Sequence, residues 1–433
     1  MVITLVRRLG GRSALLAGFI FAAAPLAAQG SLRDELSSLF TFGDCGAPLC
    51  LDVDPEFHGQ HFIPANQAGN QAILSFLDAA IGRSVANLPL GATSSGVTFT
   101  FEGGVPVITS VSAGPIFAER AQTLGRGRVY VGVSMTGLGF EEIRGVSLDN
   151  LALNFAHEDV SDDGLGDPTF ENDVFQVRLG LSMHVLITAV QITWGALDFA
   201  DVGVVVPLVR TTLAGTSEAQ IFPFGSTAFH SFSGGPGDPV LQDQTTASGS
   251  ATGLGDIATR LKVNVARAEH VGVAVLADLR LPTGSEEDFL GSGDLSWRAV
   301  GILSGRWSGF APHLNTGYLV RTGDLDNDAF LATVGFDQLI GSWVTVAAEF
   351  ISEWQIGDSK LTLPGPIMIT SPFQRTVPSS EIPSRRDDAL AASLGLKATT
   401  NRGITMVGNV IIPLGNGGVQ SGPVWTAGIE YTF

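Results

Sequence analysis

The last nine residues of the chain, WTAGIEYTF, constrain the fold more than any other stretch. Every second position from Trp425 to Phe433 is apolar or aromatic, and the positions between them hold Thr, Gly or Glu. One face of such a strand suits an apolar medium and the other suits water. Chain ends normally fray into solvent. An alternation that continues to the final aromatic residue therefore predicts a strand with neighbours on both edges, as in a closed β-barrel.

The first residues predict export. A basic start at Arg7, Arg8 and Arg12 precedes the apolar run 14–27, which is too short to span a bilayer as a helix. The letters LAAQ then offer a cleavage site after Ala28. We therefore expect a secretory signal peptide at residues 1–28, a mixed N-terminal segment at 29–126 and a barrel domain at 127–433.

Composition supports strands and excludes one class of partner. Apolar residues make up 45% of the chain and charged residues only 15%, yet no later run is long enough for a membrane-spanning helix. An apolar chain without such a helix favours alternating strands that cross a membrane as a barrel. The net charge of −18 makes nucleic acid an unsuitable partner.

From about residue 127 the chain divides into short alternating segments separated by connections of two kinds. Short connections occur near 267–270, 308–309, 341–342 and 400–403, and long polar ones near 216–255, 284–293, 357–386 and 414–423. If Phe433 marks a periplasmic end, every short connection falls on the periplasmic side, as in outer-membrane barrels. The predicted strands are 127–140, 174–190, 201–214, 256–267, 271–283, 294–307, 310–322, 329–340, 343–356, 387–399, 403–413 and 424–433.

The expected fold is thus an all-β, transmembrane antiparallel barrel of about twelve strands. Two further segments, 149–159 and 96–110, would raise the number to about fourteen, which is equally admissible for a single-chain barrel. The sequence does not decide between the two numbers.

Residues 29–126 have a different pattern. One short helix is predicted within 66–85, and a hairpin is predicted around Gly103 and Gly104. So little secondary structure cannot bury much core alone, so we expect this segment to plug the barrel or to cap its periplasmic mouth. A disordered periplasmic leader is the alternative. The apolar positions at helical spacing are Ile73, Phe76, Leu77, Ala80 and Ile81.

The two cysteines lie close together after the signal peptide. In an exported chain, Cys45 and Cys50 are expected to form a local disulfide. A zinc site would need more ligands at a suitable spacing than His58 and His61 offer. We predict no metal centre and no cofactor.

Strand alternation also divides side chains between lipid and lumen. In residues 174–190 the apolar set begins at Phe175, which assigns Arg178 and His184 to the lumen, because an arginine facing lipid near the midplane costs about 2–4 kcal/mol. Paired charges that support the barrel wall and anchor the plug are the alternative role for the polar members. The predicted lumen and substrate-path residues are Arg178, His184, Arg260, Lys262, Asp278, Arg280, Arg298, Val300, Ile302, His313, Arg321, Glu349 and Ile351.

Tryptophans give an independent indication of the membrane boundary. Those that lie at strand ends with the parity of the apolar face are Trp297, Trp307, Trp354 and Trp425. Trp194 and Trp343 also lie at strand ends but fall out of that parity.

No catalytic motif is present. The sequence contains no G-x-S-x-G, no H-E-x-x-H and no phosphate-binding loop with its lysine. Outer-membrane lipases place Ser and His together on the lipid face, whereas His184 and His313 are assigned to the lumen. We therefore expect a protein that is not an enzyme.

Three stretches carry a family resemblance: GALDFADVGVVVPLVR (195–210), TGLGDIATRLKV (252–263) and LADLRLPTGSEEDFLGSGDL (276–295). They resemble the outer-membrane transporter family named for the meta-pathway of phenol degradation, which is grouped with long-chain fatty-acid transporters of the FadL type. The likeness covers about 195–433. It implies a barrel that passes small hydrophobic or aromatic compounds inward without ATP. The Asn-Pro-Ala plug motif of the fatty-acid transporters is absent, and IPANQ at 63–67 has the order wrong.

We expect a Gram-negative outer-membrane barrel that imports small hydrophobic compounds passively. Its expected partners are outer-membrane lipid and lipopolysaccharide, a small hydrophobic substrate, and the barrel-assembly machinery, which would recognise the C-terminal strand through Tyr431 and Phe433. The alternatives are a non-selective or structural porin-like barrel and a secreted β-sandwich that acts as a binding module.

Overall fold

The computed structural model describes residues 30–42, 52–53, 71, 74–82, 99–102, 105–108, 113–225, 228–234, 237–400 and 402–433. Ser31–Phe433 forms one compact unit, distinct from Met1–Gly30. The predicted signal peptide and the predicted Cys45–Cys50 disulfide lie outside the described residues. Among the described helices, none is long and apolar enough to cross a membrane.

Twelve antiparallel strands close into a barrel, and each corresponds to one predicted segment. Closure joins the first and last barrel strands, because Thr432 pairs with Tyr130 and Trp425 with Gly137. The C-terminal strand thus has neighbours on both edges. The barrel strands are β4 (Val129–Ile143), β7 (Val174–Leu197), β8 (Ala200–Phe222), β11 (Ile257–Arg267), β12 (Val271–Leu281), β13 (Ser296–Gly305), β14 (Phe310–Arg321), β15 (Ala329–Ile340), β16 (Val344–Gln355), β19 (Ala389–Thr399), β20 (Ile404–Pro413) and β22 (Val424–Thr432).

The two segments that could have raised the number to fourteen do form strands, but outside the closed ring. Among the described strands, β6 (Leu151–Ala156) pairs with β7, and β2 (Phe99–Glu102) pairs with β3 (Val105–Ile108) in a separate hairpin. The predicted hairpin around residues 103 and 104 is therefore present.

Apolar side chains cover the outer surface of the barrel. On β22, Trp425 and Ile429 are 65% and 57% exposed, and Phe433 directly after it is 62% exposed. On β12 the alternate residues Val273 and Val275 are exposed. A closed barrel with an even number of strands and an apolar outer band belongs in a bilayer, and single-chain barrels of this kind occupy the Gram-negative outer membrane. This is the location of the protein.

All six tryptophans are exposed, each at or beside a strand end, as a girdle at the membrane boundary requires. Trp194, which seemed out of parity in the sequence, shares the outward face of β7 with Leu186, Val190 and Ile192.

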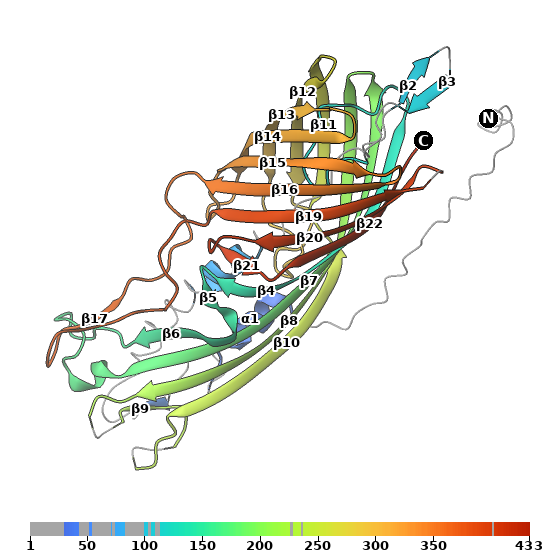
Figure 1. The fold of residues 1–433 in the computed structure, drawn as a ribbon. Coiled ribbons are helices and arrows are strands. Elements are labelled where there is room, and N and C mark those ends of the chain that lie inside the picture. The colour runs from blue at the N-terminus through green and yellow to red at the C-terminus, as the bar shows by residue number, and fades with distance from the viewer. Residues whose placement is uncertain are drawn as a thin grey trace, which may run out of the picture. The chain divides into compact units, whose positions relative to one another are not determined.

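Strands β7 and β8 are 24 and 23 residues long, whereas β11 to β16 have 10 to 12 residues. Figure 1 shows them running past their neighbours, with β10 (Gln242–Leu254) beside β8. β10 and β11 both pair with β8. The stretch at Gly255–Asp256 that joins them has one residue more than the opposing stretch of β8, which makes a β-bulge. The sequence predicted a loop at 216–255 because the outward residues of β10 are Gln, Thr and Ser, which give no apolar face.

The length of β7 overturns two predictions. Arg178 and His184 face outward and are exposed, whereas Phe175 to Ile187 at the alternate positions are buried inside. The alternation in the sequence assigned the apolar face that begins at Phe175 to lipid along the whole predicted strand. The half of β7 that contains Arg178 and His184 extends beyond the membrane. There the apolar side chains point into the barrel, and the polar side chains on the outside meet water.

Described parts of the N-terminal segment pack against the inner face of this wall. Helix α1 (Leu32–Ser38) begins at a capping box of Ser31 and Asp34 and buries Leu32 and Leu36. Residues 74–82 are helical, and the predicted apolar positions Phe76, Leu77, Ala80 and Ile81 are buried in the same core. Ile73 lies outside the described residues.

The remaining short elements lie in the connections between barrel strands or join them to the N-terminal segment. They are β1 (Asp52–Val53), which pairs with β9 (His230–Ser231), β5 (Val146–Ser147), the 3-10 helices η1 (Leu148–Asn150) and η2 (Thr169–Asn172), the pair β17 (Ile367–Ile369) and β18 (Arg375–Val377), and β21 (Val419–Ser421).

Candidate functional site

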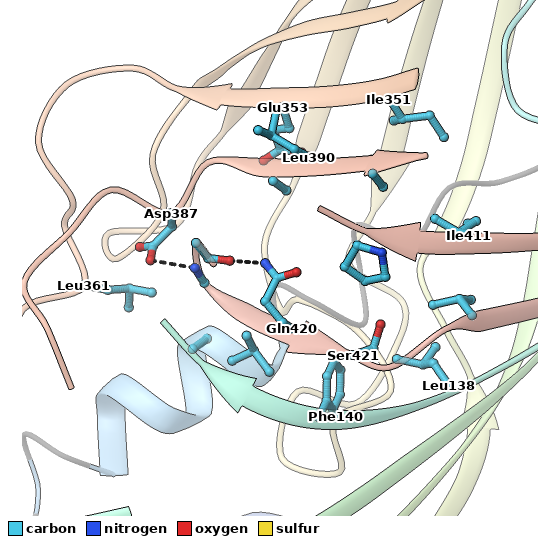
Figure 2. A pocket seen from close by; sticks show the side chains of 18 residues that line it. Leu138, Phe140, Ile351, Glu353, Leu361, Asp387, Leu390, Ile411, Gln420 and Ser421 are labelled. Atoms are coloured by element: carbon cyan, nitrogen blue, oxygen red, sulfur yellow. Dashed lines mark hydrogen bonds between the residues drawn. The ribbon is translucent and has the colours of Figure 1, made fainter. Parts of the chain in front are cut away.

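One cavity inside the barrel, called the main cavity below, has a volume of about 210 Å³. Most of its lining is apolar, with Leu138 and Phe140 from β4 and Ile411 from β20 (Figure 2). Ala80, from the helical residues 74–82, forms part of the wall. The other lining residues are Ile351, Glu353, Leu361, Asp387, Ala389, Leu390, Ala391, Pro413, Gly417, Gly418, Val419, Gln420, Ser421 and Val424.

The loops around the main cavity are held by a buried ion pair. Arg144, at φ 50°, donates from Nε to Asp387 Oδ1 over 2.8 Å and from a terminal nitrogen to the Leu361 carbonyl over 3.0 Å. Its guanidinium lies over the ring of Phe76. Asp387 also accepts from the Gly418 N–H over 3.1 Å, as Figure 2 shows. With these partners Asp387 fixes the loops rather than presenting a free charge to a ligand.

A second cavity, of about 50 Å³, lies next along the same wall toward the short-turn end of the barrel. On three strands its lining residues lie next along the wall from those of the main cavity. Thr136 neighbours Leu138 on β4, Thr426 neighbours Val424 on β22, and Val407 lies two inward-facing positions from Ile411 on β20. Ile116, Phe117, Tyr130 and Glu430 also line it.

The opposite wall is charged. On β11 to β13, Asp278 accepts from Arg260 over 2.9 Å and from Arg298 over 3.0 Å. Arg321 pairs with Glu353 across β14 and β16. A third cavity of about 40 Å³ lies among these groups and is also lined by Arg280. The polar residues of this wall compensate one another, as buried charges require.

Residues 113–124, called the inserted segment below, cross the lumen and are bound to that charged wall. The Glu349 carboxylate accepts hydrogen bonds from the backbone N–H groups of Ile116, Phe117 and Ala118, at 2.9 to 3.3 Å. Lys262 lies 3.4 Å from Glu119 and 3.8 Å from Asp201.

Further contacts extend along the segment. Arg120 pairs with Asp337, and the Ala121 N–H donates to the Ser304 hydroxyl over 3.0 Å. The Leu124 N–H donates to both Asp201 oxygens at 3.1 Å. The segment is therefore fixed at successive points from β16 to β8.

The structure separates the predicted substrate-path residues into groups. Arg260, Lys262, Asp278 and Glu349 are buried in ion pairs or in hydrogen bonds to the inserted segment. His313 is buried, 3.9 Å from Asp337 and 3.7 Å from Glu349.

The three predicted apolar residues are also divided. Ile351 lines the main cavity, whereas Val300 and Ile302 pack in a cluster with Ala121, which covers them.

Sequence reasoning missed a structural site that its own motifs encode. Asp256, the acid of GLGD, accepts from the Gly284 N–H of LPTG over 3.1 Å and from the Ser292 N–H and hydroxyl of LGSG over 2.9 Å. Thr283 donates to the Gly255 carbonyl over 2.6 Å. A Cβ at Gly291 would lie 2.3 Å from the Asp256 carboxylate, so that position requires glycine. The order of the three motifs was the sequence signal for this site, because the acid of the first motif can accept hydrogen bonds from both of the later motifs.

This arrangement also positions α1. The loop that contains LGSG buries Phe289, whose carbonyl accepts from Thr211 over 3.0 Å. The Arg33 N–H donates to the Glu287 carbonyl over 2.9 Å, and the Arg33 side chain pairs with Glu286 over 2.8 Å. Asp256 thus connects the barrel wall to the N-terminal helix.

Residues 175–365 match the model of a family described as "Putative MetA-pathway of phenol degradation". The resemblance inferred from the three motifs is confirmed over that range. A search of curated protein sequences gives no match.

Solved structures similar to this chain include outer-membrane channels. One, from Pseudomonas putida F1, is 11% identical, with 72% of this chain and 98% of that chain covered and a TM-score of 0.41. The TodX monoaromatic hydrocarbon channel, as a deltaS2 mutant, is 13% identical over 79% and 98% of the two chains, with a TM-score of 0.37. The CymD monoaromatic hydrocarbon channel is 9% identical over 71% and 88%, with a TM-score of 0.32.

Proposed function

We propose that this chain, whose residues 175–365 match the family described for phenol degradation, is an outer-membrane transporter for the passive uptake of small hydrophobic and aromatic compounds. The observation that carries the proposal is the main cavity. It lies inside a closed barrel, its lining is mostly apolar, and its volume is about 210 Å³. An apolar cavity of about 150 Å³ already accommodates benzene, so a single substituted ring fits.

The described N-terminal parts support a plugged barrel over an open pore. Residues 113–124 are fixed across the lumen, and helical residues 74–82 form part of the cavity wall. We propose that residues 29–126 act as the plug and that uptake involves no catalytic step. A hydrophobic solute gains nothing from a water-filled pore, whereas a plugged barrel with an apolar pocket offers it a favourable surface.

Two partners belong to the same proposal. The outward row that ends in Tyr431 and Phe433 would be recognised by the barrel-assembly machinery, and the exposed outer ends of β7 and β8 would contact lipopolysaccharide. The exposure of both aromatic side chains and their mutual ring contact at 5.5 Å support the first part.

The test fills the main cavity. Ala391 lines it, and the next residue on β19, Ala392, does not and faces the other side of the strand. Cells that express the protein are given labelled toluene at low concentration, and the initial uptake rate is measured. We expect Ala391→Phe to reduce uptake to that of cells without the protein, and Ala392→Phe to retain the wild-type rate.

A parallel measurement addresses the porin-like alternative. Wild-type protein in a planar bilayer should give a low ion conductance, and proteoliposomes should exclude a disaccharide. A large steady conductance with sugar uptake would show an open pore and refute the proposal. Full toluene uptake by Ala391→Phe would show that the solute does not need the main cavity, which would also refute it.

A further inference from the structure

The partition between the main and second cavities contains a buried amide, that of Asn409. On the inward face of β20, Ile411 lines the main cavity and Val407 lines the second, and Asn409 lies between them. Asn409 is 6% exposed. A solute that moves from one cavity to the other passes this residue.

The orientation of the amide is fixed by its nitrogen. Nδ2 donates to the Ser393 hydroxyl over 2.7 Å and to the Leu394 carbonyl over 3.0 Å. A backbone carbonyl can only accept, so the reversed amide would bring two acceptors together. The oxygen Oδ1 is therefore directed away from both partners, and among the described residues no donor reaches it.

The same level of the wall carries further hydroxyl groups. Asn409 is opposite Thr426 in the β20–β22 register, and Thr426 is opposite Thr136 in the β22–β4 register. The two threonine hydroxyls lie 2.9 Å apart, and both residues line the second cavity. The partition is thus a polar row that borders the apolar lining of the main cavity.

Oδ1 is covered, so a solute reaches it only by displacing a neighbour. Ile116, from the inserted segment, packs beside the amide: a Cβ at Gly395 would lie 2.6 Å from Ile116 Cγ1 and 3.2 Å from Asn409 Nδ2. Ile116 also lines the second cavity. Its side chain belongs to the segment that crosses the lumen rather than to the barrel wall, and it would be the side chain that moves when a solute enters.

We propose that Asn409 is a specificity-determining residue, which selects single-ring apolar solutes that carry one hydrogen-bond donor over hydrocarbons of the same size. A buried acceptor without a donor is unfavourable, and a solute hydroxyl satisfies it while its ring remains in the apolar lining. A hydrocarbon leaves the acceptor unsatisfied. This inference rests on the proposed function and names the substrate class within it.

The test measures equilibrium binding of phenol and benzene to the full-length protein in lipid nanodiscs, with binding to empty nanodiscs subtracted. We expect Asn409→Leu to lower the ratio of phenol to benzene affinity about tenfold, the value of one hydrogen bond. Ser393→Ala is the matched control, because it removes a partner of the same amide and keeps Oδ1. It should retain the wild-type ratio.

A measurement on the wild type alone covers the case in which Asn409→Leu does not fold. Anisole has the same ring and oxygen as phenol but no donor, and it should compete for the site about tenfold less well than phenol after correction for partitioning into lipid. Equal competition, or an unchanged ratio in Asn409→Leu, would overturn the inference and leave the importer proposal standing. No saturable binding of any of the three solutes would refute the proposed function itself.

Discussion

At the scale of single residues, one carboxylate fixes the loop between β12 and β13 to the start of β11. Asp256 is 8% exposed and accepts three hydrogen bonds from two later motifs. Those donors lie in the loop that also contacts α1 through Glu286 and Glu287. Loss of the acceptor would therefore affect both the barrel rim and the N-terminal helix.

Asp256→Ala should destabilise the protein by about 1–3 kcal/mol for each donor left buried without a partner. The temperature at which the folded barrel is lost on a heat-modifiability gel should fall accordingly. Asp163→Ala, in an exposed loop position, is the control and should leave that temperature unchanged. An equal temperature for both variants would contradict the role assigned to Asp256.

Asp78 provides a prediction about pH. Burial raises the pKa of Asp78 above its ordinary value, although the Arg33 guanidinium 2.6 Å away acts in the opposite direction. Its ionised form is therefore less favourable in the folded protein than in the unfolded chain, a penalty that is present at neutral pH and disappears as pH falls through the raised pKa.

Asp78→Asn should accordingly stabilise the protein at pH 7, and the gain should shrink as the pH is lowered. Denaturant midpoints at a series of pH values would measure it, with Asp34→Asn as a control whose difference reflects the α1 capping box instead. A gain that grows toward acid pH would show that the Arg33 bridge dominates.

At the scale of elements, strand length decided which sequence-based assignments were correct. On β12 to β16, where 10 to 12 residues match the membrane thickness, the polar residues assigned to the lumen are buried or half-buried. On β7 the same alternation continues beyond the bilayer, so Arg178 and His184 were assigned to the wrong face. The alternation of a strand shows that its two faces differ in polarity. Whether the apolar face points outward depends on whether lipid or water surrounds that part of the strand.

Cysteine labelling can test that assignment. A membrane-impermeant maleimide added to intact cells should label His184→Cys, because position 184 is exposed beyond the membrane band. Ile192→Cys on the same outward face lies among apolar residues and should resist the reagent. Labelling of both variants, or of neither above the parent chain, would contradict the placement of β7.

At the scale of the whole molecule, twelve strands and their turns follow from patterns within each strand, whereas the main cavity does not. Its lining joins β4, β16, β19, β20 and β22 to a loop residue, Leu361, and to a helix residue, Ala80. No local pattern relates such distant positions. Of the thirteen predicted path residues, Ile351 reaches this cavity because strand parity turned it inward.

The inserted segment should control conductance. The Glu349 carboxylate accepts hydrogen bonds from three backbone N–H groups. Glu349→Gln removes its negative charge and leaves one acceptor oxygen, which weakens these hydrogen bonds. We expect residues 113–124 to loosen and the single-channel conductance to rise. Glu269→Gln, at an exposed turn, should conduct like the wild type, and an unchanged conductance in Glu349→Gln would argue against a barrier at this segment.

The pairing of β22 with β4 has a consequence for the order of biogenesis. Barrel closure joins the last strand to the first, and both flank the lumen that residues 113–124 cross. Once that seam has formed, α1 and the inserted segment could enter only by threading through a ring already narrowed by its own side chains. We therefore expect the N-terminal part to fold against β7 and β8 while the sheet is still open, and the C-terminal strand to close the barrel around it afterwards.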